Sequence, residues 1–223
     1  MTTATLAPPT FGTLADVIAA AGGVPPEQVI YTPLPGTATE ADVVAYDRVG
    51  ESYELLNGIL LRKVMGAEED IIGCWLCHLL WQYVEDNDLG IVGSSQAMLR
   101  LAPGLVRMPD ACFTPWELRD RATPGAVFQD VLPTLVVEVL SASNRKGDMA
   151  AKLAEYAAAG IELVWYIDPV RKEVDVYPGG RAKSKRTFTL ADTLSGGRVL
   201  PGFVLPVARI FEKSGPRKPK KKA

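Results

Sequence analysis

Four residues of this sequence have types and surroundings that could support metal-assisted hydrolysis: Glu54, Asp110, Glu138 and Lys152. Asp110 follows a proline in the apolar segment MPDACF, and Glu138 lies in the middle of the apolar run LVVEVL. An ionised carboxylate is costly to bury alone, so each acid should be paired, protonated or bound to a metal. Two carboxylates on adjacent strands form a natural site for Mg²⁺, which completes its shell with water and substrate phosphate. Such a metal would polarise a phosphoryl group and activate a water molecule.

Each of these residues also has an ordinary structural explanation. Asp110 could cap a turn, Glu138 could pair with a core lysine or arginine, and Lys152 could be a solvated helix residue. Glu54, in YELLNG, says little by itself. The combination favours a catalytic site, because a lysine beside two buried acids would stabilise the charge that develops on phosphoryl oxygens.

The elements that must position these residues lie mainly between Pro133 and Pro169. Residues 135–140 form a short β-branched run typical of a buried strand, and a helix is predicted from Asp148 to Ala159, ended by Gly160. A second buried strand is predicted over 163–167. Strand, helix and strand within about 35 residues indicate a right-handed βαβ unit with two parallel strands.

Helical periodicity places Lys152 on one side of the predicted helix, together with Met149 and Tyr156. This position lies at the border between the core and a cleft, so the lysine stem can be buried while its ammonium group reaches the acids. Around this unit the pattern predicts further elements: a strand over 59–64, a helix from Glu69 to Asp86, two short strands or a hairpin arm in 91–101 with a break at Gly93, a strand over 106–113 broken at Pro109, and an antiparallel edge strand EVDVYP.

Length and charge suggest three regions in the 223 residues. Residues 1–50 are predicted to be a partly flexible N-terminal extension with a short amphipathic helix in residues 11–23. Within it, residues 24–50 mix Pro, Gly and short apolar pieces, typical of a linker or of an extension wrapped on the domain. Residues 51–212 form the predicted domain. Residues 213–223 carry six positive charges and no acid, which predicts a disordered tail that either binds phosphate backbones or is only solvated. Without these six charges, the 24 basic residues fall to 18 against 26 acidic ones, a net of −8 for the rest of the chain.

Several classes of protein are disfavoured by composition. The single histidine, His78, lies inside a predicted helix, which argues against Ser-His-Asp and Cys-His catalysis. Cys74-x-x-Cys77 has no second ligand pair, so we interpret it as part of a buried helix rather than a zinc or redox site. With Cys112 the cysteines are odd in number, which fits a reducing compartment. No apolar run is long enough to span a membrane and no signal peptide is evident, so we expect a cytoplasmic protein.

The run PTLVVEVLSASNRKGDMAAKLAEYAAAGIELVWYIDP resembles the hallmark segment of the Uma family of putative restriction endonucleases. YELLNG, RMPDACF and LPGFVLPVARIF resemble the other blocks of that family in the same order, so the resemblance covers residues 52–211. It implies membership of the PD-(D/E)XK nuclease superfamily: an α/β, restriction-endonuclease-like core with a mixed central β-sheet flanked by helices, here with an N-terminal extension.

The resemblance also implies roles for the four residues. Asp110 would be the motif aspartate and Glu138 the second acid, and both would bind the metal together with the carbonyl of Val139. The lysine expected two residues after Glu138 is replaced by Leu140, and Lys152 would supply its charge from the helix. Glu54 matches the acidic residue of the N-terminal element and would orient water or a second metal. The loop MGAEEDIIG departs from the family, which often has a histidine there, and its acids argue against a DNA contact from this loop.

Two hypotheses follow. The first is a Mg²⁺-dependent endonuclease, with Mn²⁺ as a substitute, that hydrolyses DNA phosphodiester bonds. The second is a catalytically inactive protein that keeps the nuclease fold as a binding or regulatory module. The intact set of two acids and a lysine favours the first, whereas the acidic body argues against it because DNA-binding surfaces are usually basic. A third possibility, a small-molecule α/β hydrolase, is disfavoured because the sequence has neither a nucleophile elbow nor a phosphate-binding glycine loop. We expect DNA but no membrane as a partner, and a homodimer is left open.

Overall fold

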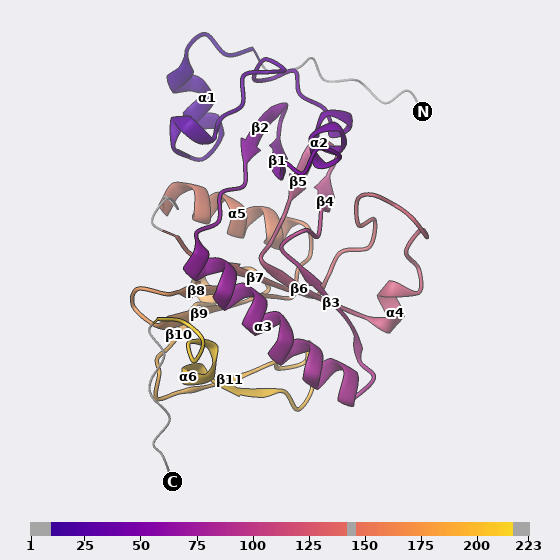
Figure 1. Cartoon of the computed structure of the whole chain (residues 1–223), viewed down its shortest axis with the longest axis vertical. Helices are drawn as coiled ribbons and strands as arrows, with labels where there is room; N and C mark the ends of the chain where they lie inside the picture. Colours follow the sequence, from indigo (N-terminus) through magenta and orange to yellow (C-terminus); the bar gives the residue numbers. More distant parts are fainter. Residues whose placement is uncertain (1–9, 142–145, 216–223) are drawn as a thin grey trace.

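A computed structural model describes residues 10–141 and 146–215, and a six-stranded mixed sheet lies at the centre of this part of the chain (Figure 1). Its strand order is β10-β9-β8-β7-β6-β3. Strands β7 and β8 are parallel, and each other neighbouring pair is antiparallel. The strands are β3 (Gly90–Ser94), β6 (Ala111–Pro115), β7 (Leu135–Val139), β8 (Leu163–Asp168), β9 (Glu173–Pro178) and β10 (Arg186–Phe188).

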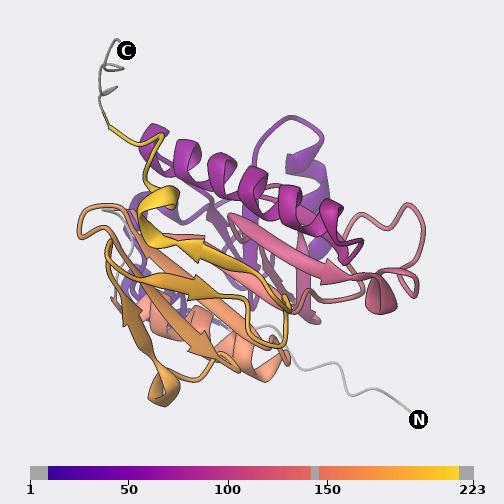
Figure 2. The same cartoon turned by 90° about the horizontal axis from the view of Figure 1, so that it is seen from below.

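Two helices cover the two faces of this sheet (Figure 2). Helix α3 (Ala67–Asp86) packs its buried side chains, among them Ile72, Leu76 and Leu80, against one face. Helix α5 (Lys146–Ala158) packs against the other face through Met149, Leu153 and Tyr156. Both helices bury positions three or four residues apart, which is the spacing that places side chains on one helical face.

The predicted βαβ unit is confirmed by β7, α5 and β8. Helix α5 begins two residues before the predicted start, at Lys146, and ends one residue before the predicted end, at Ala158. Gly160 follows with a φ of 84°, a left-handed conformation that glycine adopts readily at the end of a helix. In the parallel register Glu138 lies opposite Tyr166, near the carboxyl end of β7 and close to the start of α5.

A second, four-stranded antiparallel sheet has the order β2-β1-β5-β4 and lies beside α5 (Figure 1). Its strands are β1 (Tyr53–Leu56), β2 (Ile59–Arg62), β4 (Leu99–Ala102) and β5 (Leu105–Arg107). The N-terminal elements α1 (Leu14–Ala20), η1 (Pro26–Gln28) and α2 (Glu40–Asp47) lie against this sheet, with Val17, Val24 and Val29 buried on Leu56, Ile59 and Leu61. Residues 10–50 are therefore packed on the domain.

Three local expectations need correction or refinement. Gly93 lies inside β3, and the break falls after Ser94, where a turn leads to β4. The break near Pro109 is larger than a kink, because it separates β5 in one sheet from β6 in the other. Strand β9 is antiparallel as predicted but does not form the edge, since β10 pairs with it on its other side.

The remaining described elements are one short helix after β6 and the elements of the C-terminal part of the chain. They are α4 (Trp116–Arg119), η2 (Ala182–Ser184), β11 (Thr193–Ser195), β12 (Val204–Pro206) and α6 (Val207–Ile210). Of the predicted basic tail, Lys213 places its ammonium group 4.7 Å from the ring centre of Trp75, and residues 216–223 lie outside the described residues. Within the described part of the chain, no helix is long and apolar enough to cross a membrane.

The packing of residues 36–38 on the β1–β2 turn can be tested with Gly58→Ala. Gly58 has a φ of 81°, and an added Cβ would lie 2.5 Å from the carbonyl oxygen of Gly36. We expect a loss of about 3 kcal/mol in the free energy of unfolding by urea, from backbone strain and overpacking together. Gly104→Ala is the control, because its φ is 74° and no atom lies within 4 Å of the added Cβ. It should cost only about 1 to 2 kcal/mol, and equal losses would contradict the close packing.

Candidate active site

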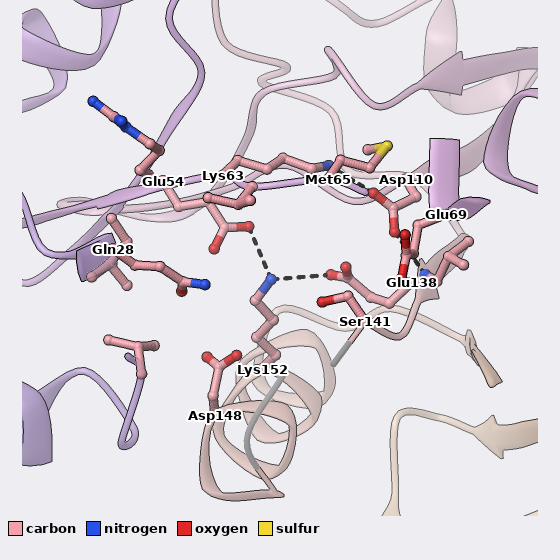
Figure 3. A pocket seen from close by; sticks show the side chains of 15 residues that line it. Gln28, Glu54, Lys63, Met65, Glu69, Asp110, Glu138, Ser141, Asp148 and Lys152 are labelled. Atoms are coloured by element: carbon pink, nitrogen blue, oxygen red, sulfur yellow. Dashed lines mark hydrogen bonds and ion pairs between the residues drawn. The ribbon is translucent and has the colours of Figure 1, made fainter. Parts of the chain in front are cut away.

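The four residues singled out in the sequence line one pocket, where the four-stranded sheet, β7 and the start of α5 meet (Figure 3). Glu54 comes from β1, Asp110 directly precedes β6, Glu138 lies in β7 and Lys152 lies in α5. All four are at most 8% exposed. The cavity has a volume of about 50 Å³. At roughly 10–15 Å³ for each water position, it has room for a few water molecules or one phosphoryl group.

Asp110 is held on both carboxylate oxygens. Its Oδ2 accepts a hydrogen bond of 2.6 Å from the backbone N–H of Val139, and its Oδ1 lies 2.9 Å from the Nζ of Lys63. Its own N–H donates to the carbonyl of Val137 over 3.0 Å. Through these contacts Asp110, which precedes β6, is hydrogen-bonded to the end of the neighbouring strand β7. Asp110 and Glu138 therefore reach the same pocket from adjacent strands.

Glu138 lies between two residues of α5. Tyr156 donates a hydrogen bond of 2.5 Å from its hydroxyl to Oε1 of Glu138, and the Nζ of Lys152 lies 3.7 Å from the same atom. Burial raises the pKa of Glu138, and the nearby Asp110 and Glu54 charges raise it further, while Lys152 lowers it. The result is a pKa of about 7. Glu138 therefore binds a proton readily near neutral pH unless a further cation stabilises its charge.

Lys152 bridges two carboxylates. Its Nζ lies 3.1 Å from Oε1 of Glu54 and 3.7 Å from Oε1 of Glu138, and Figure 3 shows the ammonium group between them. Burial lowers the pKa of Lys152, but the charges of Glu138 and Glu54 outweigh burial and raise it above its usual value. The amine is therefore a permanent cation at the border between core and cavity, as helical periodicity predicts.

Glu54 connects Lys152 to Arg107 and to the backbone of Met108. Its Oε2 accepts a hydrogen bond of 2.8 Å from Nη1 of Arg107, and its Oε1 accepts one of 3.1 Å from the backbone N–H of Met108. Burial alone would raise the pKa of Glu54, but the charges of Lys152 and Arg107 and the Met108 hydrogen bond lower it to about 2. Glu54 is thus ionised at any physiological pH.

Arg107 extends the network to α5 and was missed by the sequence analysis. Its guanidinium group is fully buried and binds Glu155 through two hydrogen bonds, of 2.7 Å from Nε and 2.9 Å from Nη2. Glu155 is three residues after Lys152, so Arg107 joins β1, β5 and the helix that carries the lysine. A basic residue in the apolar segment LVRMPD is the signal that could have identified it.

Lys63 and Asp148 were also missed. Lys63 follows β2 and shares the alternation of Ile59 and Leu61, which could have placed it on the inner side of the strand. Asp148, in the first turn of α5, is 6% exposed, and its Oδ1 has no hydrogen-bond partner. Burial raises the pKa of Asp148.

The CxxC segment lies on α3, and the structure modifies our interpretation of it. Cys77 is half-buried, and burial raises its pKa to about 11, which disfavours the reactive thiolate. Cys74 and His78, however, are exposed rather than part of the core. His78 stacks on Trp75 with ring centres 5.0 Å apart.

The pocket fits a hard cation better than a zinc-type cluster. Among the described residues, no group of three or more His, Cys, Asp or Glu side chains is placed to hold a metal ion. Asp110 and Glu138 nevertheless line the same small cavity, and Mg²⁺ often takes only one or two carboxylates and keeps several water molecules. The raised pKa of Glu138 agrees with this fit, because a bound cation would offset the cost of its buried charge.

Comparison with known proteins supports a nuclease fold. A sequence model of the Uma2 family, described as putative restriction endonucleases, matches residues 31–208. No curated protein matches the chain. Among solved structures, the chain is similar to a putative nuclease belonging to DUF820 from Anabaena variabilis ATCC 29413, with a TM-score of 0.62. That similarity covers 72% of this chain and 89% of the other at 16% sequence identity, so it shows a shared fold. The predicted restriction-endonuclease-like fold class is confirmed.

The contribution of Arg107 to the free energy of unfolding can be measured with the variant Arg107→Met. This change leaves the buried Glu54 and the partly buried Glu155 without their shared cation, and we expect a loss of about 3 to 5 kcal/mol in the free energy of unfolding. Arg100→Met is the matched control, because Arg100 pairs with Glu40 at the surface, where an ion pair contributes about 1 kcal/mol or less. If urea denaturation gave similar losses for the two variants, the buried network would not contribute more to stability than a surface ion pair.

The raised pKa of Glu138 predicts a defined pH dependence of stability. Between the unfolded pKa of 4.5 and the folded value of about 7, the folded protein binds one more proton than the unfolded chain at this group. The contribution of Glu138 is therefore favourable at low pH and is lost as pH rises through this window. Glu138→Gln should stabilise the metal-free protein by about 1 to 3 kcal/mol at pH 8, with no gain at pH 4.5. Denaturation at both pH values tests this, and Glu85→Gln on the exposed side of α3 is the control.

Proposed function

The chain belongs to the Uma2 family of putative restriction endonucleases, and from this premise we propose that it is a Mg²⁺-dependent endonuclease that hydrolyses phosphodiester bonds of DNA. One observation carries the proposal: Lys152 is held between Glu54 and Glu138 in the cavity that Asp110 also lines. Two acids and a cation around a space the size of a phosphoryl group are what hydrolysis of a phosphodiester requires.

Asp110 and Glu138, with the carbonyl of Val139, would hold the metal, and Mn²⁺ could replace Mg²⁺ there. When bound, the ion supplies Lewis-acid polarisation of the phosphoryl oxygen and lowers the pKa of a coordinated water. Tyr156 orients Glu138 through its hydroxyl, and the Val139 N–H orients Asp110. Such contacts from a second layer of residues fix the direction of metal-binding carboxylates.

Lys152 acts as a fixed positive charge. Because Glu138 and Glu54 raise its pKa, the ammonium group keeps its proton and is no proton acceptor for the attacking water. Its contribution is electrostatic, toward the negative charge that grows on the phosphoryl oxygens. Glu54 was expected to orient water or a second metal. Its contacts with Lys152, Arg107 and the Met108 N–H support a different role, in which Glu54 positions Lys152.

The alternative function is a non-catalytic binding or regulatory module with the same fold. The Lys63–Asp110 ion pair of 2.9 Å favours it, because a metal at Asp110 has to share that carboxylate with a lysine. The acidic body of the chain also favours it, since it repels a nucleic-acid backbone. A cleavage assay separates the two functions directly.

The nuclease proposal is tested by nicking of supercoiled plasmid DNA in Mg²⁺ or Mn²⁺, against a chelator control. Glu138→Ala should remove detectable cleavage, and Lys152→Ala should lower the rate by about 100-fold or more, as expected for loss of a preorganised charge. Lys152→Arg should recover only part of the activity, because a planar guanidinium places its charge differently from an ammonium group.

Lys183→Ala, at an exposed position beyond β9, serves as the matched control and should cleave like the wild type. Because Lys152 is buried between carboxylates, its variants are assayed at a temperature where circular dichroism shows them folded. Cleavage by folded Lys152→Ala at the wild-type rate would refute the role of Lys152. A wild-type protein that binds DNA without cutting it would favour the alternative function.

A further inference from the structure

One wall of the pocket comes from a segment that precedes the family match. Val24 and Gln28 line the cavity together with Glu54 and Lys152, whereas the Uma2 model matches from residue 31 onward. This part of the site therefore lies outside the sequence that the family model describes. Figure 3 shows the Gln28 side chain directed from this wall toward the ammonium group of Lys152.

The segment is fixed in place on the domain. Val24 and Val29 are 3% and 5% exposed, and the N–H of Ile30 donates a hydrogen bond of 3.0 Å to the carbonyl of Leu60. Val29 also forms an isolated β-bridge with Leu61 of β2. Gln28 is thus held between two buried valines, and its backbone position is determined by packing and hydrogen bonds.

The same segment also approaches the start of α5 closely. A Cβ added to Gly147 would lie 2.7 Å from the carbonyl oxygen of Gly22, and one added to Gly22 would lie 3.0 Å from the Cα of Asp148. Only residues without a side chain allow this approach. The wall that carries Gln28 and the helix that carries Asp148 and Lys152 are therefore packed as one unit.

This end of the pocket has hydrogen-bonding capacity that the described residues do not use. Within residues 10–141 and 146–215, the half-buried side-chain amide of Gln28 has no hydrogen-bond partner. The carboxylate of Asp148 points into the same space, and its Oδ1 is buried without a partner. A buried polar atom without a partner costs about 1 to 3 kcal/mol, so Oδ1 of Asp148 needs a donor such as a water molecule, whereas the Gln28 amide has its own N–H groups available for a ligand.

We infer that Gln28 is a substrate-positioning residue, whose amide donates a hydrogen bond to the nucleic-acid backbone beside the phosphate at Lys152. This inference rests on the proposed function. A neutral amide suits the position, because a glutamine can donate to phosphate or sugar oxygens without being held in an ion pair by Glu54 or Asp148. A contact beside the phosphate at Lys152 is with the strand backbone, and such contacts carry no sequence information.

A neutral contact has a measurable signature. The salt dependence of DNA affinity reports the number of cations that replace counterions, and an uncharged hydrogen bond does not contribute to it. Gln28→Ala should therefore weaken binding of a short DNA duplex by about 5- to 10-fold, as for loss of one hydrogen bond, with an unchanged slope of log Kd against log salt. Gln28→Lys should change the slope by about one charge.

The test is fluorescence anisotropy with a labelled duplex in Ca²⁺, followed by cleavage kinetics in Mg²⁺. For Gln28→Ala we expect a raised KM, a nearly unchanged kcat and an unchanged melting temperature. Gln82→Ala on α3 is the control, because it removes an exposed side-chain amide outside the pocket without changing the net charge, and it should bind like the wild type.

Four results would overturn the inference: equal affinity of Gln28→Ala and wild type, the same loss in Gln82→Ala, a changed salt slope in Gln28→Ala, or a lowered melting temperature of Gln28→Ala. Failure of the proposed function is distinguishable. If the wild type binds DNA without cleaving it, and Gln28→Ala binds more weakly at the same slope, the inference stands and the nuclease proposal fails. If the wild type does not bind DNA, both fail.

Discussion

The site depends on a buried chain of charges that runs from Glu155 through Arg107 and Glu54 to Lys152 and Glu138. These residues come from β1, β5, β7 and α5, so the contacts join both sheets to the helix between them. A fully buried guanidinium is tolerable only because its two carboxylate partners provide charge-assisted hydrogen bonds in the directions that its planar group requires. Loss of Arg107 or of Glu54 leaves a buried charge without a partner, which makes this pair the most costly part of the network to remove.

The network also gives two buried glutamates opposite properties. Both are desolvated, yet Glu54 has a pKa of about 2 and Glu138 a pKa of about 7. Glu54 receives two cations and a backbone N–H, whereas Glu138 shares Lys152 with Glu54 and faces the negative charge of Asp110. Glu54 is therefore ionised at physiological pH, with its charge balanced by Arg107 and Lys152. The charge of Glu138 is balanced less well, so this carboxylate binds a proton near neutral pH. Among these acids, Glu138 is the one whose surroundings leave room for an added cation.

The local elements and the main residues of the site could be predicted from sequence because their signals are local. The β-branched run before Glu138 and the helical spacing around Lys152 depend on neighbours within a few positions, and the resemblance supplied the pairing of Asp110 with Glu138. The network partners could not be found in this way. Arg107 contacts Glu54, 53 residues earlier, and Glu155, 48 residues later, and such contacts exist only once two sheets are packed on a helix.

The replacement of a strand lysine by Leu140 is consistent with this architecture. Leu140 lies two residues after Glu138, and it packs against the apolar cluster that α5 buries on the sheet. A lysine in place of Leu140 would remove one apolar side chain from this cluster. From the first turns of α5, Lys152 reaches Glu138 from the other side of the cavity, where Glu54 already provides a counter-charge. Moving the cation to the helix therefore keeps the apolar contact between β7 and α5, and it makes the placement of that charge depend on Glu54 and, through Glu155, on Arg107.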